Sequence, residues 1–335
     1  MIILSFFTKL LHFLPSETSH HLALKSLKFI YSIGLLNFLI SNRNHKTIHD
    51  NLDQKSFLDS FKNKVGFAAG LDKNGDYIDC LAALGVGFIE LGTVTPEPQS
   101  GNSKPRLFRN RKDRSLLNRL GFNNKGVDYL VKNLKKRKSE IVVGSSIGKN
   151  FYTTNDLAYR DYLFCLEKVY EFSDYIAINI SSPNTDNLRD LTSKDYLIDL
   201  LGKVKSKQEV LSSHHGYKPI FIKISPDEDL QNLREICRSI LDIGLDGIIC
   251  CNTTVDHCDE KGSGGLSGIP LKDKATKQLL FVKGIVESKI PVIASGGVMS
   301  VEDYQEKINC GADLVQVYTG FIYDGPKLID NLVNS

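Results

Sequence analysis

The chain has 335 residues, of which 41% are hydrophobic and 24% are charged, as in an ordinary globular protein. Its formal net charge of +3 is too small to indicate a nucleic-acid partner. The seven cysteines are odd in number and form no Cys-x-x-Cys pair, so we expect reduced thiols in a cytosolic compartment. Cys258 lies beside His257 and Asp256, but this spacing matches no closed zinc pattern and predicts no metal site.

Residues 1–41 are unusually apolar, and Pro15 divides them into two runs. This pattern predicts two short helices, with Ser16 as the N-cap of the second. No uncharged stretch reaches the roughly 18–20 residues of a transmembrane helix, and no cleavage site indicates a signal peptide. Two interpretations remain open from the residues alone: a helical hairpin that caps the core, or an anchor that lies on a membrane surface. Residues 42–64 are expected to form a linker leading into the next domain.

Residues 65–335 alternate short apolar runs with longer amphipathic stretches. One such stretch, Leu230–Ile243, repeats apolar residues at helical spacing. The continuous apolar runs are typical of parallel strands that are buried on both faces. Eight of these β–α units in series predict a (β/α)8 TIM barrel with an N-terminal two-helix extension. The eight expected strands are 65–70, 88–96, 141–148, 175–181, 220–226, 247–254, 291–297 and 314–320.

Polar residues stand at the carboxyl ends of these expected strands, where barrel proteins build their sites. They are Ala69 to Lys73, Thr93, Ser146, Asn179, Lys223, Asn252, Thr253, Gly296, Gly297, Tyr318 and Thr319. A ring of such residues indicates a ligand. Gly296 and Gly297 follow the seventh strand, where a glycine turn before a helix commonly binds phosphate.

Five segments together resemble the dihydroorotate dehydrogenase family, and within it the membrane-associated, quinone-reducing class 2. They are Gly66–Gly75, Glu90–Pro96, Asn118–Asn124, Tyr175–Thr185 and Gly264–Pro270. The resemblance implies oxidation of dihydroorotate to orotate in pyrimidine synthesis, with FMN as the hydride acceptor and a membrane quinone as the final electron acceptor. It also favours the anchor interpretation of residues 1–41, which would form an apolar tunnel from the membrane to the flavin.

The resemblance implies a role for each matching residue. FMN contacts would be Ala69, Gly70, Leu71, Asp72, Lys73, Thr93, Ser146, Asn179, Lys223, Cys251, Gly268, Gly297, Tyr318 and Thr319. Substrate contacts would be Lys73, Asn118, Arg119, Leu120, Gly121, Phe122, Asn179, Asn184, Asn252 and Thr253. His20 and Arg109 would approach the quinone. Two positions depart from the family: Ser146 replaces a common asparagine, and Cys251 replaces a common threonine.

Simple chemistry supports these roles. Asparagine side chains offer a donor and an acceptor, which suits the N–H and C=O edge of orotate. Lys73 would neutralise the substrate carboxylate, and Lys223 would face the flavin where negative charge develops. Ser182 stands where class 1 enzymes have a cysteine base, and Thr185 would relay its proton with a bound water. The alternative for Ser182 is that its hydroxyl only satisfies the turn before Pro183.

Three alternatives compete with this assignment. One is a soluble class 1 dihydroorotate dehydrogenase that uses fumarate or NAD, against which Ser182 and the apolar extension argue. Another is a flavoprotein like tRNA dihydrouridine synthase, which would require a basic face and an RNA-binding domain. A third is a ligand-binding barrel without catalysis, which the presence of Lys73, Ser182 and Lys223 disfavours. We expect a monomer, bound peripherally through residues 1–41 at the cytoplasmic face of a bacterial inner membrane.

Overall fold

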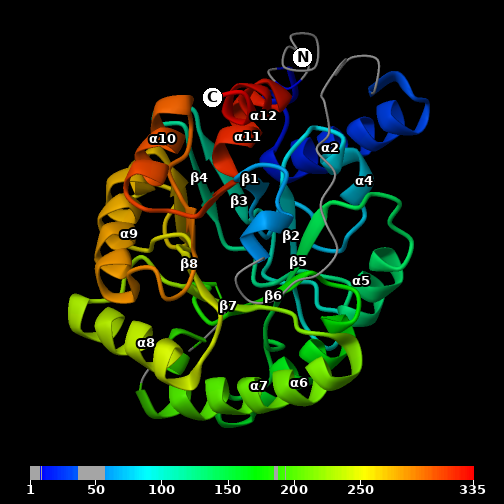
Figure 1. Ribbon diagram of the computed structural model, residues 1–335. Helices are drawn as coiled ribbons and strands as arrows, with labels where there is room; N and C mark the ends of the chain where they lie inside the picture. The colour runs from blue at the N-terminus through cyan, green and yellow to red at the C-terminus, as the bar shows by residue number, and fades with distance from the viewer. Residues whose placement is uncertain (1–7, 9, 37–56, 185–187, 193) are drawn as a thin grey trace.

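Eight parallel strands close into a barrel in the computed structural model, which describes residues 8, 10–36, 57–184, 188–192 and 194–335 (Figure 1). The order around the barrel is β1-β11-β10-β8-β7-β6-β5-β2, so the predicted (β/α)8 fold is confirmed. The strands are β1 Val65–Phe67, β2 Phe88–Val94, β5 Val142–Ile147, β6 Tyr175–Asn179, β7 Ile220–Ile224, β8 Gly247–Cys250, β10 Val292–Ser295 and β11 Leu314–Val317. Each lies within its predicted range.

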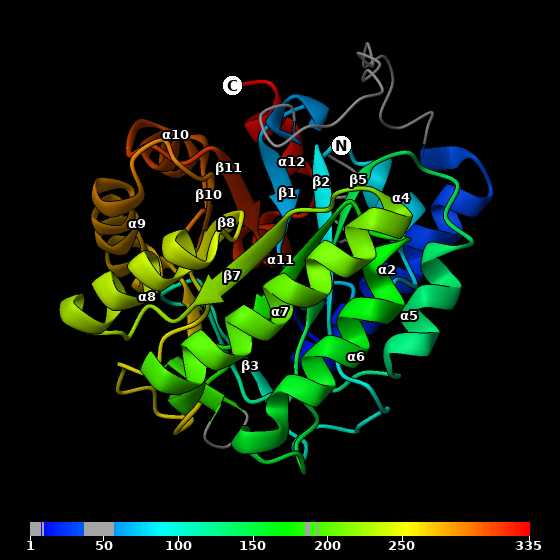
Figure 2. The same ribbon diagram turned by 60° about the horizontal axis from the view of Figure 1, so that its bottom comes forward.

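Helices surround the barrel, and Figure 2 shows α6, α7 and α8 crossing outside the strands. The helices that follow the strands are α4 Ile78–Ala82, α5 Val127–Leu134, α6 Ala158–Tyr170, α7 Lys194–His215, α8 Leu230–Ile243, α9 Lys272–Val286, α10 Val301–Asn309, α11 Thr319–Asp324 and α12 Pro326–Val333. Short 3₁₀ turns are η1 Phe57–Ser60, η2 Asn155–Leu157, η3 Leu188–Thr192 and η4 Ile269–Leu271. The predicted helix at Leu230–Ile243 is confirmed; Asp229 caps its start, and Gly244 ends it in a left-handed conformation.

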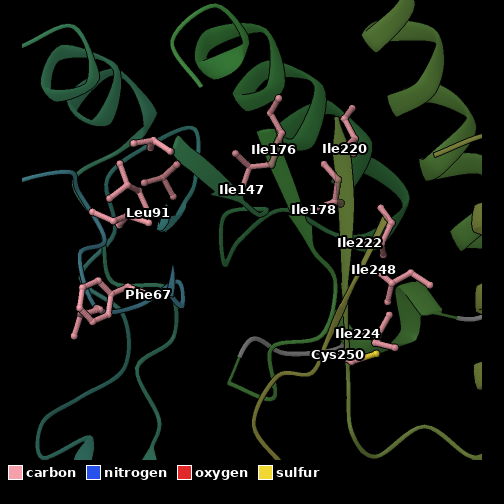
Figure 3. Close-up of a cluster of buried hydrophobic side chains, with 14 of the residues drawn as sticks. Phe67, Leu91, Ile147, Ile176, Ile178, Ile220, Ile222, Ile224, Ile248 and Cys250 are labelled. Carbon is pink, nitrogen blue, oxygen red and sulfur yellow. The ribbon is translucent and has the colours of Figure 1, made fainter. Parts of the chain in front are cut away.

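The alternation of side chains along each strand separates two packed layers. In β6, Ile176 and Ile178 face outward and join the apolar layer between strands and helices, which Figure 3 shows with Ile147 and Ile222. Tyr175 and Ala177 face the barrel interior. By the same period of two, Asn179 points into the interior at the carboxyl end of its strand, where a ligand site is expected.

Aromatic rings fill the amino end of the barrel. Phe88, Tyr175 and Phe221 pack there, and Phe57 of η1 covers them. The rings fit because glycines on the neighbouring strands leave room for them. A Cβ at Gly144 would lie 2.0 Å from the Tyr175 ring, and one at Gly247 would lie 2.2 Å from the Phe221 ring. The amino end is therefore closed, and space for a ligand lies at the carboxyl end.

A three-stranded antiparallel sheet, which the sequence did not predict, stands beside the barrel mouth. It contains β3 Leu107–Asn110, β4 Ser115–Asn118 and β9 Gly265–Gly268, in the order β3-β4-β9. Pairing of Asn118 with Gly265 brings the loop after β8 to the segment that follows β4. Two of the segments with family resemblance thus meet at the same place.

Helix α2, Ser16–Ser32, packs against β3 and α4. The expected N-cap was wrong: Pro15 occupies that position and Ser16 is already helical, because the extended backbone of Pro15, with ψ of 139°, sets the boundary one residue earlier. Thr8, Leu10 and Leu11 are helical, while most of the first predicted helix and much of the predicted linker lie outside the described residues. Within the described ranges, no helix is both long enough and apolar enough to span a membrane.

Candidate functional site

A cavity of about 140 Å³ opens at the carboxyl end of the barrel. Most of the predicted site residues line it, although they come from segments far apart in the sequence. These are Ala69, Gly70, Lys73, Thr93, Asn118, Leu120, Gly121, Phe122, Asn179, Ser182, Asn184, Lys223, Cys251, Asn252, Thr253, Gly268, Gly297, Tyr318 and Thr319. Leu71, Asp72, Arg119 and Ser146 do not line it.

A chain of buried hydrogen bonds forms one wall of the cavity. Asn179 donates through Nδ2 to Thr93 Oγ1 at 2.8 Å, and Thr93 Oγ1 lies 2.9 Å from Ser146 Oγ. Asn252 Nδ2 donates to Ser181 Oγ at 3.1 Å and to Asn179 Oδ1 at 3.3 Å. Ser146 is fully buried behind Thr93 and does not line the cavity. Its hydroxyl therefore holds Thr93 in place, and a contact of Ser146 with FMN stays a prediction.

Lys223 and Glu90 form a buried ion pair below this wall. Lys223 Nζ lies 3.6 Å from Glu90 Oε1, and Glu90 is completely buried. The second carboxylate oxygen of Glu90 accepts from Tyr175 Oη at 3.1 Å and from Gln316 Nε2 at 2.7 Å. Burial beside this carboxylate raises the pKa of Tyr175, so its hydroxyl stays a neutral donor. This role of Glu90 could not be predicted from the sequence, because a lone acid in an apolar strand does not reveal its partner.

Ser182 and Asn184 face the cavity from the loop after β6. Ser182 Oγ accepts from Asn184 N at 3.3 Å, and Asn184 Nδ2 donates to Asn118 Oδ1 at 2.9 Å. Asn118 in turn donates to Gly265 O at 2.9 Å. Asn118 and Asn184 thus hold each other at one edge of the cavity. Thr185, the predicted proton relay, lies outside the described residues.

The loop after β1 presents Lys73 and hides Asp72. Lys73 Nζ donates to Asn123 Oδ1 at 2.7 Å, and burial together with the nearby Arg106 lowers the pKa of Lys73 to about 7. Asp72 is buried and accepts from Asp76 N at 2.9 Å and Tyr77 N at 2.7 Å. Burial raises the pKa of Asp72 to about 6 despite these donors. Asp72 therefore shapes the loop and does not line the cavity.

Leu71 and Arg119 also lie outside the cavity lining. Leu71 lines a second cavity beside α2. The guanidinium of Arg119 lies 4.9 Å from the centre of the Phe108 ring and donates to the Lys261 carbonyl. Its backbone N donates to Arg106 O at 2.8 Å. Arg119 thus connects the segments around the cavity entrance without lining the cavity.

A glycine turn and a helix start close the far end of the cavity. Gly296 and Gly297 have φ values of 101° and 76°, and a Cβ at Gly297 would lie 2.3 Å from Lys272 Cα. Only glycine fits there. Ser300 caps α10 by accepting from Asp303 N at 3.3 Å, so a helix begins shortly after the glycine turn. Tyr318 and Thr319 line the same end, where α11 begins.

The second cavity is apolar, and its volume is about 650 Å³. Its walls come from α2, β3, β4 and α11, and both His20 and Arg109 line it. Burial and the charge of Lys73 lower the pKa of His20 to about 3, so this ring is neutral at physiological pH. Arg109 donates to His12 O at 2.9 Å and to Ser19 Oγ at 3.2 Å; its buried Nε has no hydrogen-bond partner among the described residues.

The two cavities share three lining residues: Leu107, Leu116 and Tyr318. The first two stand on the antiparallel sheet that the sequence did not predict. The partition between the polar and the apolar cavity therefore could not be predicted from the sequence. Ser267 and Gln316 also line the polar cavity and were not predicted, because isolated small or amide residues in strands carry no distinctive signal.

The fold and the polar cavity define a (β/α)8-barrel enzyme with its site at the carboxyl ends of the strands. Residues 51–335 match the family model described as dihydroorotate dehydrogenase. The chain belongs to the dihydroorotate dehydrogenase family. In the described part of the chain, no group of three or more His, Cys, Asp or Glu residues could hold a metal ion.

Similar proteins agree on this family. A Neisseria meningitidis protein named dihydroorotate dehydrogenase (quinone) is 45% identical over 328 residues, which cover 96% of each chain. A Photobacterium profundum protein of the same name is 50% identical over 282 residues, covering 82% of this chain and 83% of its own. The crystal structure of an Eimeria tenella enzyme of this family in complex with ferulenol has a TM-score of 0.82 at 33% identity, covering 94% of this chain and 89% of that one.

Proposed function

We propose that the protein oxidises dihydroorotate to orotate and passes the electrons through a bound flavin to a quinone. The contact between the two cavities at Leu107, Leu116 and Tyr318 carries this proposal. A polar substrate and an apolar electron acceptor can approach opposite sides of one thin partition. The relatives named above as quinone enzymes agree with it. An apolar cavity of this size does not suit the polar acceptors fumarate and NAD, so a class 1 enzyme is not favoured. An RNA-modifying flavoenzyme is not favoured either.

The cavity residues fit FMN as the flavin. The buried amide of Asn179, the Thr93 hydroxyl and the Lys223 ammonium can hold the polar edge of its ring. The turn at Gly296 and Gly297, with the helix start at Thr319, suits its phosphate. When bound, FMN would accept a hydride from the substrate and deliver electrons to the quinone. Side chains of the protein would orient the substrate and remove its proton.

Asparagines would orient the substrate ring. Asn118 and Asn184 hold each other at 2.9 Å, and Asn252 is fixed by Ser181, so their remaining donors and acceptors are arranged before the substrate arrives. Lys73 would bind the substrate carboxylate as a cation. These contacts would set which ring face lies against the flavin.

Ser182 would remove the proton that leaves with the hydride. Its hydroxyl is buried and lines the cavity, and its contact with Asn184 N holds the oxygen in place. Because a serine hydroxyl is a weak base, its own proton must pass on as it takes one from the substrate carbon. We assign that relay to Thr185 and a bound water.

Residues 1–41 would hold the protein peripherally at a membrane, at the cytoplasmic face in a bacterium. Three apolar side chains of this segment are mostly exposed: Phe13 at 78%, Phe29 at 64% and Ile33 at 57%. Such a face suits the boundary of lipid head groups and acyl chains. The double change Phe13→Glu and Ile33→Glu should abolish co-sedimentation with phospholipid vesicles while reduction of a water-soluble quinone analogue continues. Unchanged co-sedimentation would contradict the membrane assignment.

The quinone assignment is tested by filling the apolar cavity. Ala23 of α2 lines it, whereas Thr18 of the same helix is exposed and does not. Ala23→Trp should reduce quinone reduction at least tenfold while dihydroorotate still bleaches the flavin at the normal rate. Thr18→Trp serves as the matched control and should change neither step. Normal quinone reduction in the Ala23 variant would refute the assignment.

A further inference from the structure

We propose that Arg106, held by Glu17 of helix α2, is a positioning residue for the dihydroorotate site, and that it makes substrate binding depend on the N-terminal extension. The inference rests on the proposed function. It goes further, because Glu17 and Arg106 line neither cavity.

All three nitrogens of the Arg106 guanidinium form hydrogen bonds. Nη2 donates to Glu17 Oε1 at 2.8 Å, and Nε lies 3.3 Å and 3.4 Å from the two carboxylate oxygens. Nη1 donates to Ser100 O at 2.5 Å and to Asn102 O at 2.9 Å. The Arg106 side chain is only 7% exposed and that of Glu17 is 16% exposed. A planar fork that is bound on several sides is a rigid connection rather than a surface ion pair.

The loop that Arg106 binds, at Ser100 and Asn102, contacts the substrate side of the cavity. Asn102 N donates to Leu120 O at 3.3 Å, and Asn102 Nδ2 lies 3.5 Å from Asn184 O. A Cβ at Gly121 would lie 2.7 Å from Asn102 Oδ1, so Asn102 also packs directly on the turn before Phe122. Leu120, Gly121 and Asn184 all line the cavity. Asn102 therefore touches two separate substrate-facing segments at once.

Arg106 fixes the same region through its backbone. Its carbonyl accepts from Arg119 N at 2.8 Å, which sets the chain just after Asn118. The Glu17–Arg106 ion pair also affects the pKa of Lys73: the charge of Arg106 lowers it, and that of Glu17 raises it. One ion pair thus bears on both the shape and the charge of the substrate side.

Glu17 connects Arg106 to helix α2 of the N-terminal extension. Without the charge of its carboxylate, Arg106 remains a mostly buried cation without an opposite charge. A buried cation that loses its partner moves toward water or distorts its surroundings. We therefore expect the Asn102 loop to shift, and the two segments it contacts to lose their fixed spacing.

The test measures orotate binding to the flavin-loaded protein through the change in visible absorbance. Glu17→Gln should raise the orotate Kd about tenfold while FMN stays bound. The control Lys28→Met removes another link between α2 and the barrel, from Lys28 Nζ to Asp76 O at 2.8 Å, and should leave the orotate Kd unchanged. Equal orotate affinity in the Glu17 variant and the wild type would overturn the inference. An equal loss in both variants would also overturn it, because general loosening of α2 would then suffice.

A double-mutant cycle tests the route through Asn102. Asn102→Ala alone should also raise the orotate Kd, and Glu17→Gln should add little in that background. Fully additive effects would contradict transmission through Asn102. If Glu17→Gln does not fold, unchanged orotate affinity in Asn102→Ala is the result that overturns the inference. Wild-type protein that holds flavin but gives no orotate response would instead contradict the proposed function itself.

Discussion

Lys223 Nζ lies 3.6 Å from Glu90 Oε1 inside the barrel, where Glu90 is fully buried and Lys223 is 5% exposed. The two residues stand on β7 and β2, which β6 and β5 separate in the strand order, and their side chains meet across the interior. Removing two charges from water is costly unless they are paired and further bonded. Tyr175 and Gln316 supply the further bonds to Glu90. The pair therefore holds a cation at the floor of the polar cavity.

Replacing Lys223 by methionine should have two separable effects. The free energy of unfolding should fall by about 3–5 kcal/mol, because Glu90 is left as a buried charge without a cation. The rate at which dihydroorotate bleaches the flavin should fall roughly 100-fold, because the charge that stabilises developing negative charge is lost. Denaturant unfolding and anaerobic stopped-flow absorbance measure the two effects.

Adding Glu90→Gln to Lys223→Met provides the control. The double variant carries no unpaired charge, so most of the lost stability should return while the bleaching rate stays low. A recovered rate would show that Lys223 serves only to neutralise Glu90 and has no role toward the flavin.

Ser182→Ala should lower turnover by a factor of about 10² to 10⁴, the range of a lost general base, while FMN and orotate remain bound. Ser182→Cys restores a group that can accept a proton, and it should recover part of the rate with a changed pH profile. Steady-state assays and orotate titrations test both variants. Turnover near the wild-type level in the alanine variant would leave Ser182 as a turn residue.

Ser146→Ala should weaken FMN binding about fivefold, although Ser146 does not line the cavity. Its hydroxyl holds Thr93 at 2.9 Å, and one hydrogen bond contributes about 1 kcal/mol. Ser145 makes a comparable buried contact to Ser173 at 2.7 Å on the outward side of the same strand. Ser145→Ala is therefore the matched control and should leave FMN affinity unchanged. Fluorescence titration of the apoprotein with FMN measures both, and equal losses would exclude a specific role for Ser146.

Orotate should bind more weakly as pH rises above about 7. The pKa of Lys73 in the ligand-free protein is lowered to about 7, so this side chain is charged below that pH and neutral above it. Because the carboxylate of orotate prefers the charged form, binding above pH 7 must also take up a proton. The Kd should rise up to tenfold per pH unit between pH 7 and 8.5 and be nearly constant from 6 to 6.5. Lys73→Met should bind weakly at every pH, and a slope that persists in this variant would assign the proton to another group.

The barrel could be predicted because each strand is buried on both faces and therefore reads as an apolar run. The antiparallel sheet could not, since pairing Asn118 with Gly265 joins segments 147 residues apart through very short strands. The strand ends were also overestimated: the first was expected to reach Gly70 but ends at Phe67, because glycine turns continue an apolar run without continuing the ladder.

The candidate site, like the fold, could be predicted only in part. Residues at strand ends, such as Asn179 and Lys223, follow from the alternation along a strand and do line the cavity. Ser146 and Asp72 were expected to contact the flavin; both are buried and neither lines the polar cavity. Sequence position locates a residue near the mouth, but whether its side chain reaches the cavity depends on what the neighbouring segments pack over it. The predicted roles of the lining residues in catalysis and binding stay predictions.

The most direct test of the account is the visible spectrum of the purified protein without oxygen. We predict a yellow protein that dihydroorotate bleaches and that a quinone then recolours, whereas fumarate and NAD do not. A colourless protein, or one that dihydroorotate does not bleach, would contradict the proposed reaction. Recolouring by fumarate or NAD but not by quinone would contradict the assignment of the apolar cavity.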